Sequence, residues 1–241
     1  MNLNKTLLFT SLVFLLTFLM GCSPLEKYKE KKSVFEGEVQ KLEALTEYQK
    51  LDDYLLFVGS SSIRRWGNMA PHMAPHLGVK RGYGGAHFYD LIHFTERLVA
   101  PHTKAKALIC FVANDISGRE NDLSPAEVFR LFKHFVRQVH RLHPNLPIYF
   151  IEITPTPSRW KVWNKISHVN AKVQQYANAR PKINYIETQH KFLGSNGQPV
   201  PDYFVRDSLH LSEKGYQMWS AIIKENLTQN PPAQEIPIPN L

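Results

Sequence analysis

Cysteine is scarce in this sequence, and the usual signatures of metal and nucleic-acid binding are missing. Of the 241 residues only two are cysteines, Cys22 and Cys110. No cysteine or histidine spacing is that of a zinc site, so we expect no metal. There is no zinc-finger spacing, RNA-binding signature or long lysine and arginine block. The formal net charge of +8 therefore favours an anionic membrane surface or cell-wall polymer over nucleic acid as a neighbour.

The sequence also lacks a long transmembrane stretch, although its first residues are strongly apolar. Lys5 precedes an apolar run over residues 6–20, which is too short for a comfortable membrane span and is typical of an export signal. The run closes with Leu19-Met20-Gly21-Cys22, which resembles a bacterial lipobox. We therefore predict a lipoprotein signal peptide at residues 1–21. An uncleaved N-terminal anchor and an ordinary secreted protein are the alternatives.

This leader predicts where the mature chain resides. Lipidation of Cys22 would anchor it to a membrane, since each buried CH₂ group adds about 0.8 kcal/mol. Ser23 follows the cysteine, and in a Gram-negative source this favours an outer-membrane lipoprotein facing the periplasm. The other cysteine, Cys110, lies in an apolar run and is expected to be a buried, inert thiol rather than the disulfide partner of Cys22.

Composition divides the rest of the chain into three parts. Residues 22–33 are polar and rich in lysine and glutamate, which is typical of a tether. Residues 34–230 have the periodic apolar patterns of one folded domain. Residues 231–241 are rich in proline and predict a loose C-terminal tail.

Short apolar runs alternate with helical patterns across the domain. Strands are predicted at residues 54–58, 77–80, 107–112, 148–153 and 183–186. Helical spacing is found in residues 34–51, 87–99, 124–139, 158–178 and 213–227. The clearest helix start is Ser124-Pro125-Ala126-Glu127, a capping-box pattern with proline at the first helical position. The alternation predicts a single three-layer α/β/α domain around a parallel sheet of about five strands.

Ligands of such sheets bind beyond the carboxyl ends of the strands. Ser61 lies just after the first predicted strand, where it could cap a helix or act as a nucleophile. A nucleophilic serine needs a base and an orienting acid. Asp207 and His210 are three residues apart and can face one site, although a surface aspartate and a solvated histidine are the alternative. Asn114 follows another strand, as a turn former or an amide donor.

The glycine-rich run at residues 81–85 could form a phosphate cradle. It is not a G-x-G-x-x-G sequence, and no Walker lysine follows it. Nucleotide binding is therefore not expected, and we predict no cofactor.

In this order, the post-strand serine, glycine-rich loop, asparagine and late Asp-x-x-His resemble the SGNH hydrolases, also called GDSL esterases. The resemblance covers roughly residues 54–225 and implies a flavodoxin-like fold. It makes Ser61, Asp207 and His210 the catalytic triad. It also implies an oxyanion hole formed by Ser61, Gly85 and Asn114. Residues 59–66 and 157–160 look like a bacterial subgroup with Gly-Ser-Ser-Ser in place of Gly-Asp-Ser-Leu.

Three departures from the family pattern involve four positions. Ser60 replaces the aspartate before the nucleophile, which removes no triad member. Val112 replaces the usual glycine of the asparagine block, in a loop that is one residue tighter than in the subgroup. Ala86-His87 replaces a small polar pair, so His87 could contact substrate or simply begin a helix.

The resemblance implies a serine esterase, and the aromatic and basic residues suggest its substrate. Trp66, His87, Arg159 and Trp160 are candidates for substrate binding at the pocket rim, although Trp66 could equally belong to the core. The predicted location favours an acylated or acetylated glycan or a lysophospholipid as substrate. Two alternatives remain: a catalytically silent lipoprotein that binds glycan or a protein partner, and an O-acyltransferase with the same triad. The sequence predicts no oligomeric state.

Overall fold

The computed structural model describes residues 25, 26, 28 and 34–232 of the chain. The predicted signal peptide at residues 1–21, the lipidation site Cys22, and nearly all of the tether and of the C-terminal tail lie outside the described residues. Among the residues that are described, no helix is both long and apolar enough to cross a membrane.

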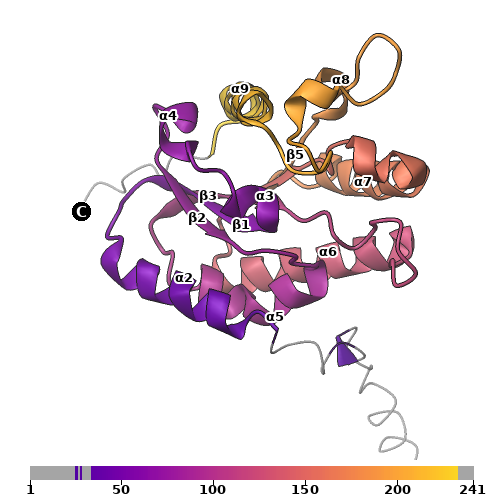
Figure 1. Ribbon diagram of the computed structural model, residues 1–241. Helices are drawn as coiled ribbons and strands as arrows, with labels where there is room; N and C mark the ends of the chain where they lie inside the picture. The colour runs from indigo at the N-terminus through magenta and orange to yellow at the C-terminus, as the bar shows by residue number, and fades with distance from the viewer. Residues whose placement is uncertain (1–24, 27, 29–33, 233–241) are drawn as a thin grey trace, which may run out of the picture.

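One parallel sheet forms the centre of the described chain (Figure 1). Its strands are β1 (Tyr54–Gly59), β2 (Gly78–Gly82), β3 (Ala105–Phe111), β4 (Ile148–Ile151) and β5 (Ile183–Ile186). They pair in the order β2-β1-β3-β4-β5, all in parallel. The predicted parallel sheet of about five strands is therefore confirmed, with each strand within a few residues of its expected position.

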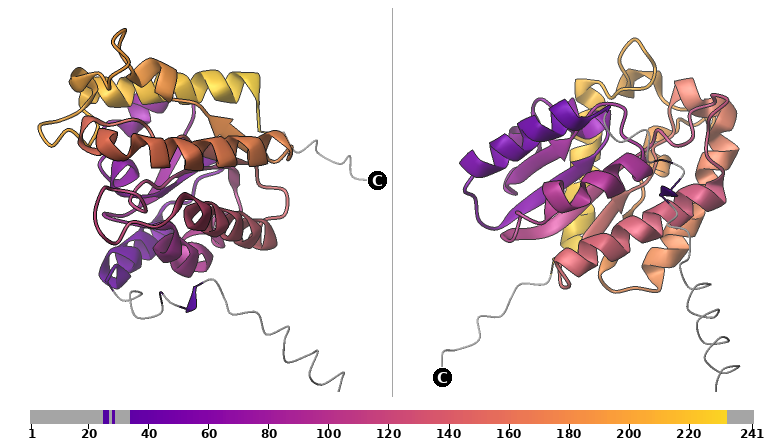
Figure 2. Two further views of the ribbon diagram at one scale, coloured as in Figure 1. Left: turned by 90° about the vertical axis from the view of Figure 1, so that its right-hand side faces the viewer. Right: turned by 90° about the horizontal axis from the view of Figure 1, so that it is seen from below.

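Helices cover both faces of this sheet. On one side lie α2 (Glu36–Tyr48), α5 (Phe88–Val99) and α6 (Pro125–Leu142), and on the other lie α4 (Met69–Met73) and α9 (Glu213–Gln229) (Figure 1). Helix α7 (Trp163–Asn178) packs against α6 and β5. The two further views show the same layers around the sheet (Figure 2). Because both faces are covered, the inner strands β1, β3 and β4 are almost entirely buried, which explains their apolar sequences. The edge strands β2 and β5 are only partly buried and carry polar residues.

Local sequence signals account for several helix boundaries. Ser124 caps α6 as predicted, since its Oγ accepts a hydrogen bond from the Glu127 backbone N–H at 3.2 Å. The helix expected at residues 158–178 is instead divided. It starts as the 3-10 helix η2 (Pro157–Val162) and becomes α-helical only at Trp163. The shorter elements α3 (Ser61–Arg64), α8 (Gln189–Phe192) and η3 (Pro201–Tyr203) had no periodic pattern to predict them.

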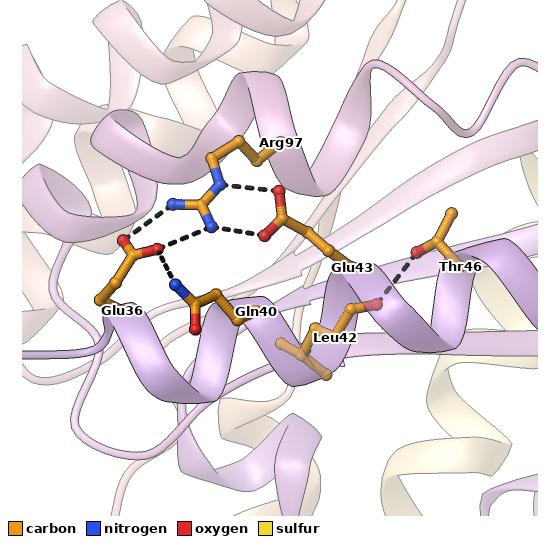
Figure 3. A network of polar contacts seen from close by, with 6 residues as sticks. All are labelled: Glu36, Gln40, Leu42, Glu43, Thr46 and Arg97. Atoms are coloured by element: carbon orange, nitrogen blue, oxygen red, sulfur yellow. Dashed lines mark hydrogen bonds and ion pairs between the residues drawn. The ribbon is translucent and has the colours of Figure 1, made fainter.

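Helix α2 is attached to α5 by one arginine with two acidic partners (Figure 3). Arg97 donates to the Glu36 carboxylate at 2.8 and 2.9 Å and to Glu43 Oε1 at 2.7 Å, and a second bond joins it to Glu43 Oε2. Gln40 also donates to Glu36 at 2.9 Å. The planar guanidinium group thus holds two turns of α2 at once.

The remaining cysteine behaves as expected. Cys110 is fully buried in β3, with its thiol free. Burial raises the pKa of this thiol, so the group is unreactive at neutral pH.

Candidate active site

The strand order places two predicted site residues side by side. In a 2-1-3-4-5 sheet the chain reverses its direction of winding between β1 and β3, and ligands bind at that switch point. Ser61 follows β1 and Asn114 follows β3. The fold therefore brings them to the same end of neighbouring strands, although they lie 53 positions apart in the sequence.

A glycine makes the turn into the serine possible. Gly59 ends β1 with φ of +134°, and a Cβ there would lie 1.9 Å from the Phe111 carbonyl oxygen. The close approach and the backbone conformation both demand glycine. The Ser60 N–H donates to the same carbonyl at 2.9 Å. The turn is thereby fixed to β3, and Ser61 begins α3 at the carboxyl edge of the sheet.

Ser61, His210 and Asp207 form a continuous hydrogen-bonded relay. His210 Nε2 lies 3.0 Å from Ser61 Oγ. On the other side of the ring, His210 Nδ1 lies 2.6 Å from Asp207 Oδ2. Both distances are those expected of a nucleophile, its base and the acid that orients the base. The geometry suits proton transfer from the serine hydroxyl to the imidazole.

The Asp207 carboxylate is fixed by the turn that contains it. Its Oδ1 accepts hydrogen bonds from the backbone N–H groups of Leu209 at 3.0 Å and His210 at 2.9 Å. Ser208 closes the turn with φ of +57°. Partial burial alone would raise the pKa of Asp207, but the hydrogen bonds from His210 and Leu209 lower it to about 2. The group is therefore ionised at neutral pH and can stabilise a positively charged imidazole.

The Asn114 amide is held at both ends. Its Nδ2 donates to the Ala86 carbonyl at 2.9 Å. Its Oδ1 accepts from Arg159 Nη2 at 2.8 Å, while Arg159 Nη1 donates to the Ala113 carbonyl at 2.5 Å. A primary amide has two N–H donors, and Ala86 accepts from one of them. The loop after β3 is thus connected directly to the glycine-rich loop after β2.

Gly85 in the glycine-rich loop has a backbone conformation that favours glycine. Gly85 adopts φ of +75°, whereas a Cβ there would meet Phe35 only at an ordinary 3.6 Å. The requirement is therefore conformational and not steric. The neighbouring Gly84 N–H donates to Glu38 Oε2 at 3.3 Å. Helix α2, which carries Glu38 and follows Phe35, thus contacts the loop that holds Gly85.

Ser61, His210 and Asn114 line a small cavity, called here the Ser61 cavity, whereas Asp207 and Gly85 lie outside its lining. Its walls are Ser60, Ser61, Ser62, Phe111, Ala113, Asn114, Thr154, Thr156, Arg159, Leu209 and His210. Its volume is about 20 Å³, which is room for about one group the size of a water molecule. A larger polar hollow lies along the edge strand β5 between α7 and α9, and it contains none of the predicted catalytic residues.

Trp66 lies in the core and not at the rim of the Ser61 cavity. It is fully buried, stacked on Tyr216 with ring centres 5.3 Å apart and in edge contact with Phe57 and Trp219. Its indole N–H donates to His72 Nδ1 at 3.0 Å. The prediction that Trp66 contacts substrate at the rim is therefore wrong. An aromatic cluster between β1 and α9 surrounds the indole, and its one polar group is already bonded.

Two other predicted contact residues lie outside the Ser61 cavity. His87 precedes α5, where its N–H donates to Asp90 Oδ2 at 3.0 Å and its ring stacks on Tyr89 at 4.8 Å. It therefore occupies the helix-start position that was the alternative to substrate contact. Trp160 is half-buried and stacks on Trp163 with centres 5.8 Å apart.

Sequence reasoning missed parts of the cavity wall. Phe111 and Thr156 line it without having been considered as site residues, and Arg159 belongs to the wall and not to an exposed rim. Asp115, which follows Asn114 in the sequence, was not predicted as a site residue either. Its buried carboxylate accepts from the Phe88 N–H at 3.2 Å, and burial raises the pKa of Asp115 to about 6. Its position after a strand was the only available signal.

The fold and this geometry together define a class of protein. A single α/β domain with a five-stranded parallel sheet, and a Ser–His–Asp relay beyond its carboxyl edge, has the SGNH hydrolase fold. The chain belongs to the GDSL-like Lipase/Acylhydrolase family, whose sequence model matches residues 53–218. An ester hydrolase is the activity that this family suggests. No match is found among curated proteins.

Solved structures with similar folds come from several bacteria. A candidate platelet activating factor from Streptococcus pneumonia is 23% identical with a TM-score of 0.71, covering 84% of this chain and 96% of its own. A candidate acylhydrolase from Bacteroides fragilis is 21% identical with a TM-score of 0.66, covering 79% and 95%. A GDSL-like lipase from Bacteroides thetaiotaomicron is 19% identical with a TM-score of 0.66, covering 82% and 98%. At these identities the likeness shows the fold.

Proposed function

We propose that this protein is a serine hydrolase of carboxylic esters that works through an acyl-Ser61 intermediate. The observation that carries the proposal is the relay from Ser61 Oγ to His210 Nε2 at 3.0 Å and from His210 Nδ1 to Asp207 Oδ2 at 2.6 Å. The described residues already hold these groups at reacting distances, so no rearrangement is needed before the first proton transfer.

The relay supports a two-step reaction. Ser61 Oγ attacks the ester carbonyl carbon while His210 Nε2 takes the hydroxyl proton, giving a tetrahedral oxyanion. Collapse of this intermediate breaks the bond to the alcohol, which leaves with the proton from His210. Water then attacks the carbonyl carbon of acyl-Ser61 while His210 takes one of its protons. The second tetrahedral intermediate collapses by breaking the bond to Ser61 Oγ, which receives the proton back from His210, and the carboxylic acid is released. Asp207 stays ionised throughout and stabilises the charged imidazole.

The negative charge that forms on the carbonyl oxygen requires hydrogen-bond donors that point at this oxygen. We assign this role to the backbone N–H groups of Ser61 and Gly85 and to the Nδ2 amide of Asn114. Asn114 lines the same cavity as Ser61, which supports its part in this assignment. Loss of one such donor typically lowers the rate on the order of 10²- to 10³-fold.

The size of the Ser61 cavity favours short acyl groups. Its volume of about 20 Å³ has room for a group about the size of a methyl, so that a longer alkyl chain would have to extend out of the cavity. The walls are closely packed, since Phe111, Thr154 and Thr156 are all buried. Among the substrates expected at a cell envelope, an acetylated glycan therefore fits better than a long-chain lipid. The predicted lipidation of Cys22 would place the enzyme beside such a substrate.

Hydrolysis of p-nitrophenyl acetate, butyrate and octanoate by the fragment from Ser23 tests this proposal. We expect kcat/KM to be highest for acetate and to fall by at least about 10-fold at octanoate, because a longer chain has no room beside Ser61. Ser61→Ala and His210→Ala should each remove the activity. Equal rates in the wild type and both variants would contradict the enzyme assignment, and a preference for octanoate would contradict only the acyl-size assignment.

A further inference from the structure

Arg159 is a buried cation whose two hydrogen-bond partners are neutral, while the carboxylates of Asp122 and Asp115 act on it through their charge alone. Only 8% of the residue is exposed. Its Nη2 donates to Asn114 Oδ1 and its Nη1 to the Ala113 carbonyl. Burial lowers the pKa of Arg159 to about 10, so the guanidinium group remains charged at neutral pH. Burying a charge is costly unless strong hydrogen bonds compensate for it, and here those bonds fix one side chain of the proposed oxyanion hole.

We propose that Arg159 is a positioning residue that sets the orientation and donor strength of the Asn114 amide. This inference rests on the proposed ester hydrolysis at Ser61. Under this proposal Arg159 does not bind substrate at the pocket rim, which was the role predicted from the sequence. The group that touches the reacting oxygen is Asn114 Nδ2, and Arg159 acts through it.

The two ends of the Asn114 amide are nearly symmetric. Its oxygen and nitrogen are nearly the same in shape, so a free asparagine can turn either atom toward a ligand. If Asn114 turned over, Oδ1 would replace the Nδ2 donor and meet the oxyanion with like charge. Two contacts oppose this rotation: Arg159 can donate only to an oxygen, and the Ala86 carbonyl can accept only from the NH₂ group. The pair therefore selects one orientation.

The same contact strengthens the donor. A positive charge on the oxygen side of an amide draws electron density from the nitrogen, so that the N–H groups become better donors. In a buried cavity this polarisation is poorly screened. It increases when negative charge forms on the substrate oxygen, so that it favours the transition state over the bound ester. A loss of Arg159 is therefore expected to lower kcat more than it raises KM.

A double-mutant cycle with p-nitrophenyl acetate tests the inference. The variants are Arg159→Met, Asn114→Ala and the pair together, with Arg159→Lys as the variant that keeps the charge but loses the planar fork. We expect Arg159→Met to lower kcat by about 10- to 100-fold with KM changed less than about 3-fold, and Arg159→Lys to lie between it and the wild type. In the Asn114→Ala background the same change should alter kcat by less than about 3-fold.

A merely structural role gives a different result. If Arg159→Met lowers kcat by the same factor with and without Asn114, or if it raises KM at constant kcat, the inference is overturned. The side-chain amide NMR signal of Asn114 provides a reading that needs no turnover and serves if Arg159→Met does not fold. Arg159→Lys should shift this signal toward the position of a solvent-exposed asparagine, and an unchanged signal overturns the inference. A wild type without hydrolysis and without labelling by a fluorophosphonate would contradict the proposed function instead.

Discussion

At the scale of single residues, the candidate site depends on backbone hydrogen bonds as much as on its reactive side chains. Asp207 is held by two N–H groups of its own turn, so two consecutive peptide units fix the carboxylate that contacts the imidazole. Gly59 has the same kind of role at the nucleophile, because a side chain there would overlap the Phe111 carbonyl. Small changes at such positions are expected to move Ser61 or His210 out of reach.

A buried tyrosine within the glycine-rich loop leads to a stability prediction. Tyr83 is fully buried against Phe35 and Phe94, and its hydroxyl has no hydrogen-bond partner among the residues that the structure describes. A buried hydroxyl without a partner costs about 1–3 kcal/mol. We therefore expect Tyr83→Phe to leave the free energy of unfolding unchanged or to raise it by about 1 kcal/mol, as measured by urea denaturation.

Tyr149→Phe is the matched control. The Tyr149 hydroxyl donates to the Asn230 carbonyl at 2.5 Å, so its removal should lower the free energy of unfolding by about 1 kcal/mol. A loss of more than about 1 kcal/mol in Tyr83→Phe would contradict the prediction and show that the hydroxyl has a partner after all.

At the scale of elements, α2 supports the proposed oxyanion loop from outside the sheet. Helix α2 (Glu36–Tyr48) lies before residue 53, where the match to the family begins. Glu38 nevertheless accepts from the Gly84 N–H, and Phe35 lies against Gly85. Arg97 holds α2 in place (Figure 3). Through α2 it therefore supports the loop of Gly84 and Gly85, although Arg97 does not contact that loop.

Arg97→Met is expected to loosen α2. Each ion pair is partly exposed, so the pairs are screened, and we expect a loss of only about 1 kcal/mol in the free energy of unfolding. Amide hydrogen exchange over α2 should increase. Lys104→Met is the control, because the Lys104–Asp52 pair is 3.7 Å long with both side chains largely exposed. Equal exchange over α2 in the wild type and Arg97→Met would contradict the proposed support.

Elements differ in how far the sequence predicts them. The inner strands β1, β3 and β4 were predictable because burial on both faces leaves apolar runs. The long helices were predictable because one stripe of each faces the core. The division of the predicted 158–178 helix into η2 and α7 was not predictable, since both parts continue one apolar pattern. Helix α3 has four residues, about one turn, and so shows no periodicity.

At the scale of the whole molecule, the site is an assembly of distant segments at one edge of the sheet. Ser61, Asn114 and His210 line one cavity, and the rule that parallel sheets bind ligands at their carboxyl edge predicted this meeting. The direction of individual side chains could not be predicted from the sequence. Trp66 and Arg159 are both close to site residues in sequence, yet packing turns one into the core and binds the other to Asn114. The predicted location at the cell envelope depends on residues 1–33 and stays a prediction.

Covalent labelling tests the central claim, a nucleophilic Ser61, most directly. The fragment from Ser23 is incubated with a fluorophosphonate, and the labelled peptide is identified by mass spectrometry. We predict one label per chain, on Ser61, with no label in Ser61→Ala and labelling slowed by about 10³-fold or more in His210→Ala. The fluoride leaves when Ser61 Oγ forms its bond to phosphorus, so the reaction requires an activated hydroxyl but no natural substrate. A folded wild type that takes up no label, or takes it up on another residue, would contradict the account.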